Sequence, residues 1–300
     1  MKQVLENARI RTAEPERTMR ILKQAHGLDP QDQGASIAIG NFDGVHLGHR
    51  SVIDLARQAA RRLGAPLGVL TFEPHPRAFF AAEAPPFRLT GSATRSERLA
   101  RLGVECLYEL TFNKALAALS PEGFARAILH DGLRVRHVVV GANFRFGKNR
   151  AGNVDMLAAL GRKLHFGVTA APLVNDPQSR VSSTSIRAAL SEGQARLATR
   201  RLGEPHRLNG RLKHLGQQDF TLSLSEAGRS LTEVMLPRPG IYAIRVDSAA
   251  GSARGLGYVA ARSSRQADLP GIALTIFGAG AGMDSSEVSV ALLDYHGSDM

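Results

Sequence analysis

Two histidines stand three residues apart in the stretch "IAIGNFDGVHLGHRSVIDLARQA" (residues 37–59), where an apolar run gives way to an amphipathic pattern. This order predicts a strand, a tight turn and then a helix. Residues three apart share one face of a helix, so His46 and His49 would both project toward a group bound at the helix start. The free N–H groups and the positive end of the helix dipole favour an anion there. Two imidazoles that donate hydrogen bonds could stabilise the charge on a phosphoryl group in transfer.

Two plainer interpretations fit the same histidines, namely a helix cap and a metal site. A zinc site would need a third and a fourth ligand at a recognisable spacing, which we do not find, so we assign no metal ligands. Gly40 and Gly44 would let the backbone turn tightly and approach a ligand closely.

The composition predicts a soluble cytoplasmic protein with no membrane partner. The chain has 300 residues, enough for two domains, and 43% of them are hydrophobic, yet no apolar stretch is long enough to cross a bilayer. The first 20 residues carry scattered charges and no apolar signal segment. Cys106 is the single cysteine, which fits a reducing compartment and a buried thiol.

The positive charge lies in one part of the chain. The net charge is +11, and residues 201–300 hold ten basic and ten acidic residues, so the whole excess lies in residues 1–200. The cations are dispersed and aromatic residues make up only 5% of the chain, which favours small polyanions such as nucleotides over a nucleic acid. A merely solvated basic surface remains an alternative.

The chain has two successive regions with different hydrophobic patterns. From residue 36 to about 201, apolar runs alternate with helical patterns at 48–63, 94–102, 121–130, 154–164 and 184–199, which predicts an α/β domain with a parallel sheet. Beyond residues 203–206, alternating segments separated by turns predict a small antiparallel β-barrel or sheet. We therefore divide the chain into an N-terminal extension (1–34), an α/β domain (35–203) and a β domain (204–300). The sequence indicates no oligomeric state and no role for residues 1–34.

Four stretches in order resemble one family. "GNFDGVHLGHR" resembles the HxGH signature of nucleotidyltransferases in the form found in bacterial FAD synthetases, the bifunctional riboflavin kinase/FMN adenylyltransferases. "TFEPHPRAFF" (71–80), "VVVGANFRFGKNRAG" (138–152) and "RVSSTSIRAAL" (180–190) are similar to further motifs of that family. Pantetheine-phosphate and nicotinate-mononucleotide adenylyltransferases also carry HxGH, so the companion motifs make the likeness specific. It implies a Rossmann-like nucleotidyltransferase domain followed by a flavokinase barrel.

The resemblance assigns roles to particular residues. A serine and a threonine at a helix start, with an arginine one turn later, would form a nest for the β- and γ-phosphates of ATP. A plain helix cap beside a surface arginine is the alternative there. The implied catalytic residues are His46, His49, Asn143 and Arg187. The implied ATP-binding residues are Gly40, Phe42, Asp43, Gly44, Arg180, Ser183 and Thr184.

Aromatic side chains would pack the isoalloxazine ring of the flavin, and we assign this role to Phe80, Phe124 and Phe146, although each could be ordinary core. In the "EPHP" turn, Pro74 and Pro76 would stiffen the loop, and His75 would have a positioning or a purely structural role. The implied reaction is attack of the FMN phosphate on the α-phosphorus of ATP, with Mg²⁺ neutralising the polyphosphate and pyrophosphate leaving. Orientation and charge stabilisation would supply most of the catalysis.

The β domain departs from the family's pattern. "NGRLKHLG" and "LPRPGIYAIRV" still resemble the flavokinase barrel, but Phe220, Thr221, Leu222 and Ser223 stand where the family has Pro-Thr-Ala-Asn. Ser289 stands where the family has its glutamate base. Glu287 lies two residues earlier, roughly 6–7 Å away along a strand.

The sequence therefore predicts a barrel without riboflavin kinase activity, in a chain that reaches Met300 without the family's terminal helix. A fully bifunctional enzyme and a non-catalytic flavin-binding paralogue are the alternatives. Because the barrel would lack chemistry of its own, we expect a chain that ends near Glu204 to keep adenylyl transfer and to lose stability or solubility.

Overall fold

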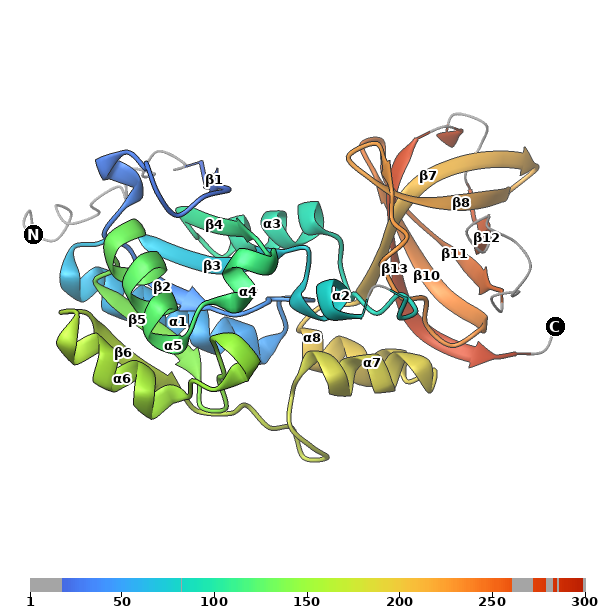
Figure 1. Cartoon of the computed structure of the whole chain (residues 1–300). Coiled ribbons are helices and arrows are strands. Elements are labelled where there is room, and N and C mark those ends of the chain that lie inside the picture. Colours follow the sequence, from blue (N-terminus) through green and yellow to red (C-terminus); the bar gives the residue numbers. More distant parts are fainter. Residues whose placement is uncertain (1–17, 82, 261–271, 279–282, 285, 299–300) are drawn as a thin grey trace, which may run out of the picture.

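The computed structural model describes residues 18–81, 83–260, 272–278, 283–284 and 286–298, so residues 1–17 of the expected extension lie outside the described part. A parallel sheet flanked by helices comes first and an antiparallel β-barrel follows it (Figure 1). The predicted fold class is confirmed. None of the helices in the described residues is long and apolar enough to span a membrane.

The parallel sheet has six strands in the order β1-β4-β3-β2-β5-β6. Every pairing in it is parallel, as the alternation of strands and helices in the sequence predicts. Its strands are β1 (Arg20–Leu22), β2 (Ser36–Ile39), β3 (Leu67–Glu73), β4 (Cys106–Thr111), β5 (His137–Gly141) and β6 (Gly167–Ala171).

Helices connect these strands where the periodic patterns predict them. The pattern at 184–199 divides into two helices because Gly193 takes a left-handed conformation, φ 78°. The longer helical segments are α1 (Leu47–Leu63), α3 (Ser92–Arg101), the π-helical η2 (Phe124–Gly132), α6 (Val154–Lys163), α7 (Ser183–Ser191) and α8 (Ala195–Leu202). The shorter ones are η1 (Pro30–Asp32), α2 (Pro76–Phe80), α4 (Lys114–Ala118), α5 (Pro121–Gly123) and η3 (Lys148–Arg150).

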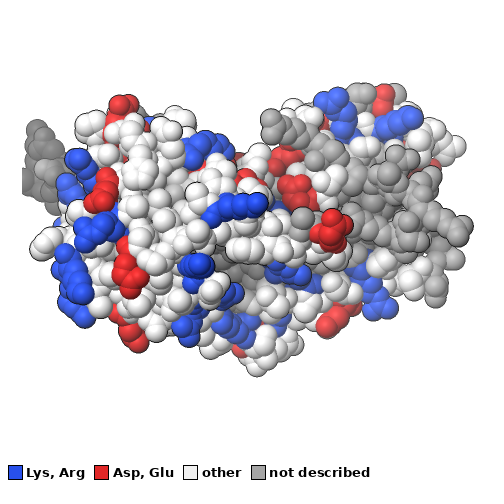
Figure 2. Space-filling model, in the orientation of Figure 1, with Lys and Arg blue, Asp and Glu red and all other residues white. Residues whose placement is uncertain are grey.

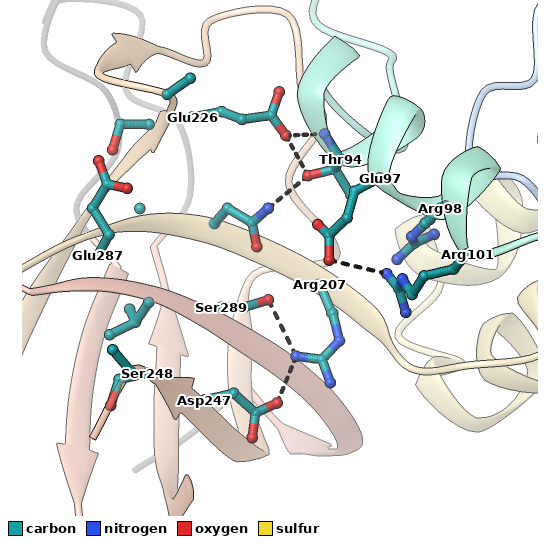
Figure 3. A pocket seen from close by; sticks show the side chains of 16 residues that line it. Thr94, Glu97, Arg98, Arg101, Arg207, Glu226, Asp247, Ser248, Glu287 and Ser289 are labelled. Atoms are coloured by element: carbon teal, nitrogen blue, oxygen red, sulfur yellow. Dashed lines mark hydrogen bonds and ion pairs between the residues drawn. The ribbon is translucent and has the colours of Figure 1, made fainter. Parts of the chain in front are cut away.

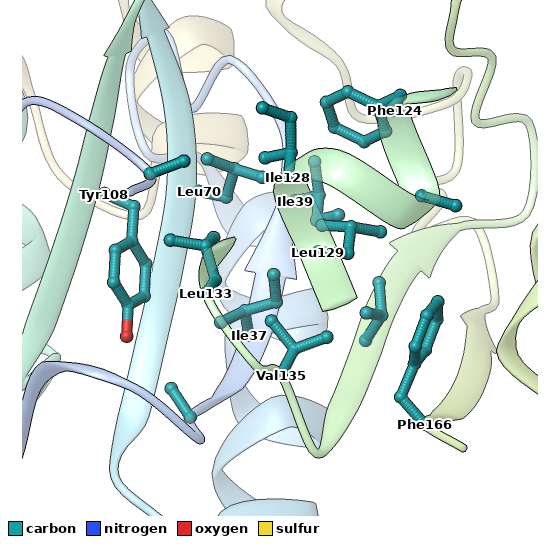
Figure 4. Close-up of a cluster of buried hydrophobic side chains, with 14 of the residues drawn as sticks. Ile37, Ile39, Leu70, Tyr108, Phe124, Ile128, Leu129, Leu133, Val135 and Phe166 are labelled. Atoms are coloured by element: carbon teal, nitrogen blue, oxygen red, sulfur yellow. The ribbon is translucent and has the colours of Figure 1, made fainter. Parts of the chain in front are cut away.

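The sheet is buried on both faces. Ile37 and Ile39 of β2 point into a cluster that η2 and α6 complete, shown in Figure 4. Ala38, between them in sequence, points to the opposite face, where α1 and α3 pack. Burial on both sides explains why β2 and β5 read as continuous apolar runs rather than as alternating strands.

Strand β1 lies in the segment that the sequence analysis set apart as an extension. It pairs with β4 at the edge of the parallel sheet, and the Tyr108 hydroxyl of β4 donates to the backbone oxygen of Asp32 at 2.6 Å. Residues 20–22 therefore form an edge strand of this sheet, and the chain at Asp32 is hydrogen bonded to its neighbour β4. Cys106 at the start of β4 is fully buried, and burial raises the pKa of its thiol, so it behaves as a core residue.

The barrel closes through a pairing between β12 and β8, and all its ladders are antiparallel. Alternate side chains of its strands form a separate core, with Phe220 and Tyr242 fully buried. Its strands are β7 (His206–Gly216), β8 (Asp219–Glu226), β10 (Gly240–Ser248), β11 (Gly251–Val259), β12 (Ile272–Ile276) and β13 (Glu287–Gly297), with the two-residue β9 (Arg229–Ser230) beside β8.

The sheet core predicts a contrast between two isoleucines. Ile37→Ala should lower the free energy of unfolding by about 2–5 kcal/mol, because Ile37 is fully buried and its loss leaves a cavity. Ile21 on the edge strand is 47% exposed, so Ile21→Ala should cost under about 1 kcal/mol. Urea unfolding followed by circular dichroism measures both. Equal losses in the free energy of unfolding would contradict the assignment of Ile37 to the core and of Ile21 to the exposed edge.

Candidate active site

A cleft of about 1220 Å³ lies beyond the carboxyl ends of β2, β3 and β5. Ligands of open α/β sheets bind at this edge, because the turns and the helix starts meet there. The residues predicted from the sequence to form the site come together in it, with one exception. Those that line it are Gly40, Phe42, Asp43, His46, His49, Phe80, Phe124, Asn143, Phe146, Arg180, Ser183, Thr184 and Arg187.

His46 and His49 form a stacked pair at the start of α1. Their ring centroids lie 3.6 Å apart with an interplanar angle of 16°. Nδ1 of His46 accepts the backbone N–H of His49 at 3.2 Å, so His46 is the N-cap of the helix. A neutral His46 ring with Nδ1 as acceptor carries its proton on Nε2, which leaves that N–H free for a ligand. Capping the helix therefore does not use the Nε2 side of the ring.

Both rings are neutral at physiological pH. Burial, followed by the charges of Arg180 and Arg187, lowers the pKa of His46 to about 4. Burial and the neighbouring His46 lower the pKa of His49 well below its usual value. Within the described residues Nδ1 of His49 is buried without a hydrogen-bond partner. The pair therefore offers N–H donors rather than fixed charges.

The turn before α1 is held in an unusual backbone conformation. Phe42, Gly44 and Val45 all have positive φ angles, of 50°, 84° and 44°. Such conformations cost free energy in residues with a side chain and often mark functional turns.

Gly44 is the exception among the predicted site residues, because it does not line the cleft. A Cβ on it would lie 2.9 Å from Cδ1 of Leu89, so this position needs glycine for packing and for its backbone angle.

Asp43 lines the cleft, but its carboxylate is buried and bound by protein donors. Its side chain is 1% exposed, and Oδ1 accepts the backbone N–H groups of Leu89 and Thr90 at 2.8 and 3.3 Å. Oδ2 accepts Nη2 of Arg187 at 2.6 Å. With both oxygens bound, this carboxylate holds the Arg187 guanidinium in place. The contact of Asp43 with ATP stays a prediction.

Helix α7 brings its N-terminus to the same cleft. Ser182 and Ser185 form a capping box, which leaves the backbone N–H groups of Ser183 and Thr184 without acceptors inside the helix. The Ser183 hydroxyl donates to the backbone oxygen of Asp43 at 3.0 Å and ties the starts of α1 and α7 together. Two helix starts therefore face one cleft, which favours an anionic ligand.

The cleft carries a strong positive charge. Asn143 Oδ1 accepts Nη2 of Arg180 at 2.9 Å, so the turn after β5 holds this guanidinium at the cleft. The cations that line the cleft are Arg77, Lys114, Arg145, Lys148, Arg150, Arg180 and Arg187, and Asp43 is the only acidic residue among the described lining residues. In Figure 2, Lys and Arg side chains gather in the lower middle of the face, while Asp and Glu are scattered.

Phenylalanines form the other wall of the cleft. Eight of the twelve in the chain line it, and the sequence analysis picked out three of these as flavin-binding. Phe80 is 71% exposed at the mouth, with its ring 5.7 Å from that of Phe112, whereas Phe124 and Phe146 are buried beneath. Of the five outside the flavin assignment, Phe42 was assigned to ATP and contacts His49. The other four make ring contacts within the aromatic group, and they are Phe72, Phe79, Phe112 and Phe144. Phe79 lies inside the quoted 71–80 motif, and no local pattern marked Phe112.

The "EPHP" turn lies beside the cleft, and its first residue, Glu73, forms ion pairs with two buried arginines. Glu73 accepts Nη1 of Arg88 at 2.8 Å and Nη2 of Arg95 at 2.9 Å, and both arginines are almost fully buried. Nδ1 of His75 accepts the backbone N–H of Arg77 at 3.0 Å and caps α2. This ring therefore caps α2 and also lines the cleft.

The described residues contain no cluster of three or more histidine, cysteine or acidic side chains that could hold a metal ion. The cleft is thus built from neutral imidazole donors, backbone N–H groups, guanidinium groups and aromatic rings. This set of groups can bind a nucleoside polyphosphate together with a flat aromatic ligand.

Comparison with known proteins agrees with this chemistry. Residues 28–185 match the family model described as FAD synthetase. A bifunctional riboflavin kinase/FMN adenylyltransferase of Pseudomonas fluorescens is 39% identical over 229 residues, which are 76% of this chain and 73% of that protein. The one of Escherichia coli K12 is 34% identical over the same shares. The chain belongs to the FAD synthetase family. It carries an FMN adenylyltransferase domain, for which ATP and FMN are the substrates.

A solved structure supports the architecture independently. The crystal structure titled as a macrolide-efflux protein from Streptococcus pneumoniae superposes with a TM-score of 0.79 at 24% identity, covering 94% of this chain and 92% of that one. At this identity the likeness shows the shared fold alone.

The buried histidines predict a pH-dependent stability. Burial lowers the pKa of His46 to about 4 and those of His75 and His206 to about 3, whereas the unfolded chain protonates histidine near pH 6.5. The unfolded state therefore binds more protons below pH 6.5, so the free energy of unfolding should fall as the pH drops from 6.5 to 5. Each histidine contributes up to about 1.4 kcal/mol per pH unit.

Denaturant titrations at several pH values measure this slope. His46→Gln removes one titrating group, so the decline in the free energy of unfolding should be shallower by up to about 1.4 kcal/mol per pH unit. His165→Gln, at an exposed position, is the matched control. A free energy of unfolding that stays level between pH 6.5 and 5 would contradict the prediction.

Proposed function

We propose that this protein transfers AMP from ATP to FMN, forming FAD and pyrophosphate, and that it has lost riboflavin kinase activity. The observation that carries the first part is the convergence of two neutral imidazoles and two helix starts on one cationic cleft with an aromatic wall. A phosphate chain fits the part of the cleft formed by the imidazoles, the helix starts and the cations, and an isoalloxazine ring fits the aromatic wall.

Each group then has a role in an in-line transfer. An oxygen of the FMN phosphate attacks the α-phosphorus of ATP while the bond to the β-phosphate oxygen breaks. The N–H groups of His46 and His49 stabilise the charge on the oxygens of the reacting phosphorus. Arg187 and the N–H groups at the start of α7 hold the β- and γ-phosphates, and Asn143 places Arg180 beside them. The attacking phosphate is already anionic, so no general base is required.

Magnesium would enter with the nucleotide. Asp43 is the only carboxylate among the described lining residues, and its two oxygens are occupied by protein donors. The residues present therefore do not fit a resident Mg²⁺ site, and the ion's ligands would be phosphate oxygens and water.

The loss of kinase activity rests on two strand positions in the barrel. Where the family has Pro-Thr-Ala-Asn, this chain has a regular part of β8, with Phe220 and Leu222 in the barrel core. Thr221 is paired there with Lys213 on one side and with Ala273 on the other. A paired strand in this position lacks the proline and the asparagine that the family uses to hold its nucleotide.

Ser289, at the position of the family's base, lines a pocket of about 480 Å³ between α3 and the barrel (Figure 3). Its hydroxyl accepts Nη1 of Arg207, which also binds Asp247. Glu226 is bound by the start of α3, whereas Glu97 and Glu287 form exposed ion pairs with Arg101 and Arg211. The contacts of Ser289, Asp247 and Glu226 favour a structural role for this part of the pocket.

The imidazole role predicts a sharp effect of one substitution. His46→Asn keeps an N-cap acceptor for α1 but removes the ring donor, so kcat for FAD formation should fall by about 10²–10³ while FMN binding changes little. Turnover assays and fluorescence titration of FMN measure the two quantities. Wild-type turnover in His46→Asn or in His49→Ala would contradict the role of the two imidazoles as hydrogen-bond donors in the transfer.

The proposed loss of kinase activity predicts that the wild-type protein releases no ADP and forms no FMN when riboflavin, ATP and Mg²⁺ are supplied. Chromatography of the flavin products with a coupled ADP assay measures this. FMN as acceptor in the same preparation is the control for an active enzyme. Stoichiometric FMN from riboflavin would mean that the chain is bifunctional and that Phe220, Ser223 and Ser289 are not disabling.

A further inference from the structure

Residues 87–90, between α2 and α3, connect the active-site cleft to the barrel. On the cleft side, Leu89 and Thr90 donate backbone N–H groups to the Asp43 carboxylate, and the Thr90 hydroxyl accepts the N–H of Gly44 at 3.3 Å. The backbone oxygen of Phe87 accepts Nε of Arg187 at 2.6 Å. This short segment therefore fixes both the HxGH turn and Arg187.

On its other side the same segment is bound to the barrel chain between β9 and β10. The backbone oxygen of Glu233 accepts the N–H groups of Phe87 and Arg88 at 3.1 and 3.0 Å. The N–H of Met235 donates to the oxygen of Arg88 at 2.9 Å, which completes a parallel bridge between Arg88 and Val234. Three backbone hydrogen bonds thus set the position of residues 87–88 from the barrel.

The Phe87 ring adds a second contact with the site. It lies 5.3 Å from Cζ of Arg187 and 4.6 Å from Cζ of Arg77, and the His75 ring meets it edge-on at 5.0 Å. Phe87 is 7% exposed and does not line the cleft, so it contacts three lining side chains from behind. Guanidinium groups are attracted to the face of such a ring.

A second link from the barrel runs through α3. This helix begins after Gly91, which has no side chain to cap it, and Glu226 of β8 accepts the N–H groups of Ala93 and Thr94 instead (Figure 3). One turn further on, Arg98 is buried and donates Nη1 to the backbone oxygen of Gly44 at 2.9 Å. Barrel residues therefore reach the HxGH turn by two routes.

We propose that the barrel positions the adenylyl-transfer site, and that Phe87 is a positioning residue for Arg187. This inference rests on the proposed function. It replaces the expectation drawn from the sequence that a chain ending near Glu204 would keep adenylyl transfer, because that chain would lack Glu226 and Glu233–Met235. Under this proposal the barrel contributes to adenylyl transfer even though it lacks riboflavin kinase activity.

A double-mutant cycle tests the role of Phe87. Phe87→Leu keeps the backbone oxygen that binds Arg187 but removes the ring, so the KM and Kd for ATP should rise roughly tenfold while the Kd for FMN changes little. In an Arg187→Ala background, the same change should have almost no further effect on the Kd for ATP, since its target is absent. Phe166→Leu, at a buried phenylalanine outside the cleft, is the control for lost packing.

The outcomes of this cycle separate the inference from the proposed function. If the wild type forms no FAD, the proposed function fails. If the wild type forms FAD but Phe87→Leu weakens ATP equally with and without Arg187, or no more than Phe166→Leu does, the positioning role fails.

A second pair of variants tests the bridge to the barrel. Met235→Pro and Met235→Ala both shorten a buried side chain, but only the proline removes the N–H that binds Arg88. We expect kcat/KM for FAD formation to be roughly tenfold or more lower in Met235→Pro than in Met235→Ala, with similar circular dichroism spectra. Equal kcat/KM values for the two variants would contradict the proposal that the bridge between Arg88 and Val234 positions the site. The Phe87 cycle tests the proposal separately, without a change to the barrel backbone.

Discussion

The buried carboxylate of Asp43 is the constraint on which the site depends. A charged group that is 1% exposed is stable only when it is paired and hydrogen bonded, and here it receives two backbone N–H groups and one guanidinium. These donors come from residues 89–90 and from α7, which lie far apart in the sequence. Satisfying one carboxylate therefore fixes the HxGH turn, the 87–90 segment and Arg187 relative to one another.

The electrostatics of the cleft follow from the same arrangement. Arg180 and Arg187, together with burial, keep His46 neutral, so the positive charge is carried by guanidinium groups and the imidazoles act as hydrogen-bond donors. Neutral donors that are fixed in place need no rearrangement as charge develops on a phosphoryl group. In the proposed transfer, the arginines would bind the phosphates that stay anionic throughout. This division explains how a site with so many donors can function without a free carboxylate.

Periodic features of the sequence predicted most of the fold. The apolar runs and helical patterns located β2 to β6 and the helices between them, since each pattern reflects burial along a whole element. Strand β1 has only three residues and therefore no period to detect, and it fell in a segment set apart as an extension. The single glycine at 193 was enough to divide a predicted helix into α7 and α8.

Residues that line the candidate cleft were predicted where motifs are local and were missed where the lining depends on long-range contacts. The histidine pair and the serine-rich helix start lie within short motifs, whereas Phe112 and Phe87 reach the cleft or its rear wall only through tertiary packing. The positioning role of Asp43 could not be read from its neighbours in sequence, because the groups that bind it begin 46 residues away.

The most direct test follows the α-phosphorus of ATP. The purified protein is incubated with FMN, Mg²⁺ and ATP labelled at the α-phosphate, and the flavin products and pyrophosphate are quantified. The account predicts one labelled FAD for each pyrophosphate released. Tight FMN binding with unlabelled flavin and intact ATP would contradict it and would indicate a flavin-binding protein without transferase activity.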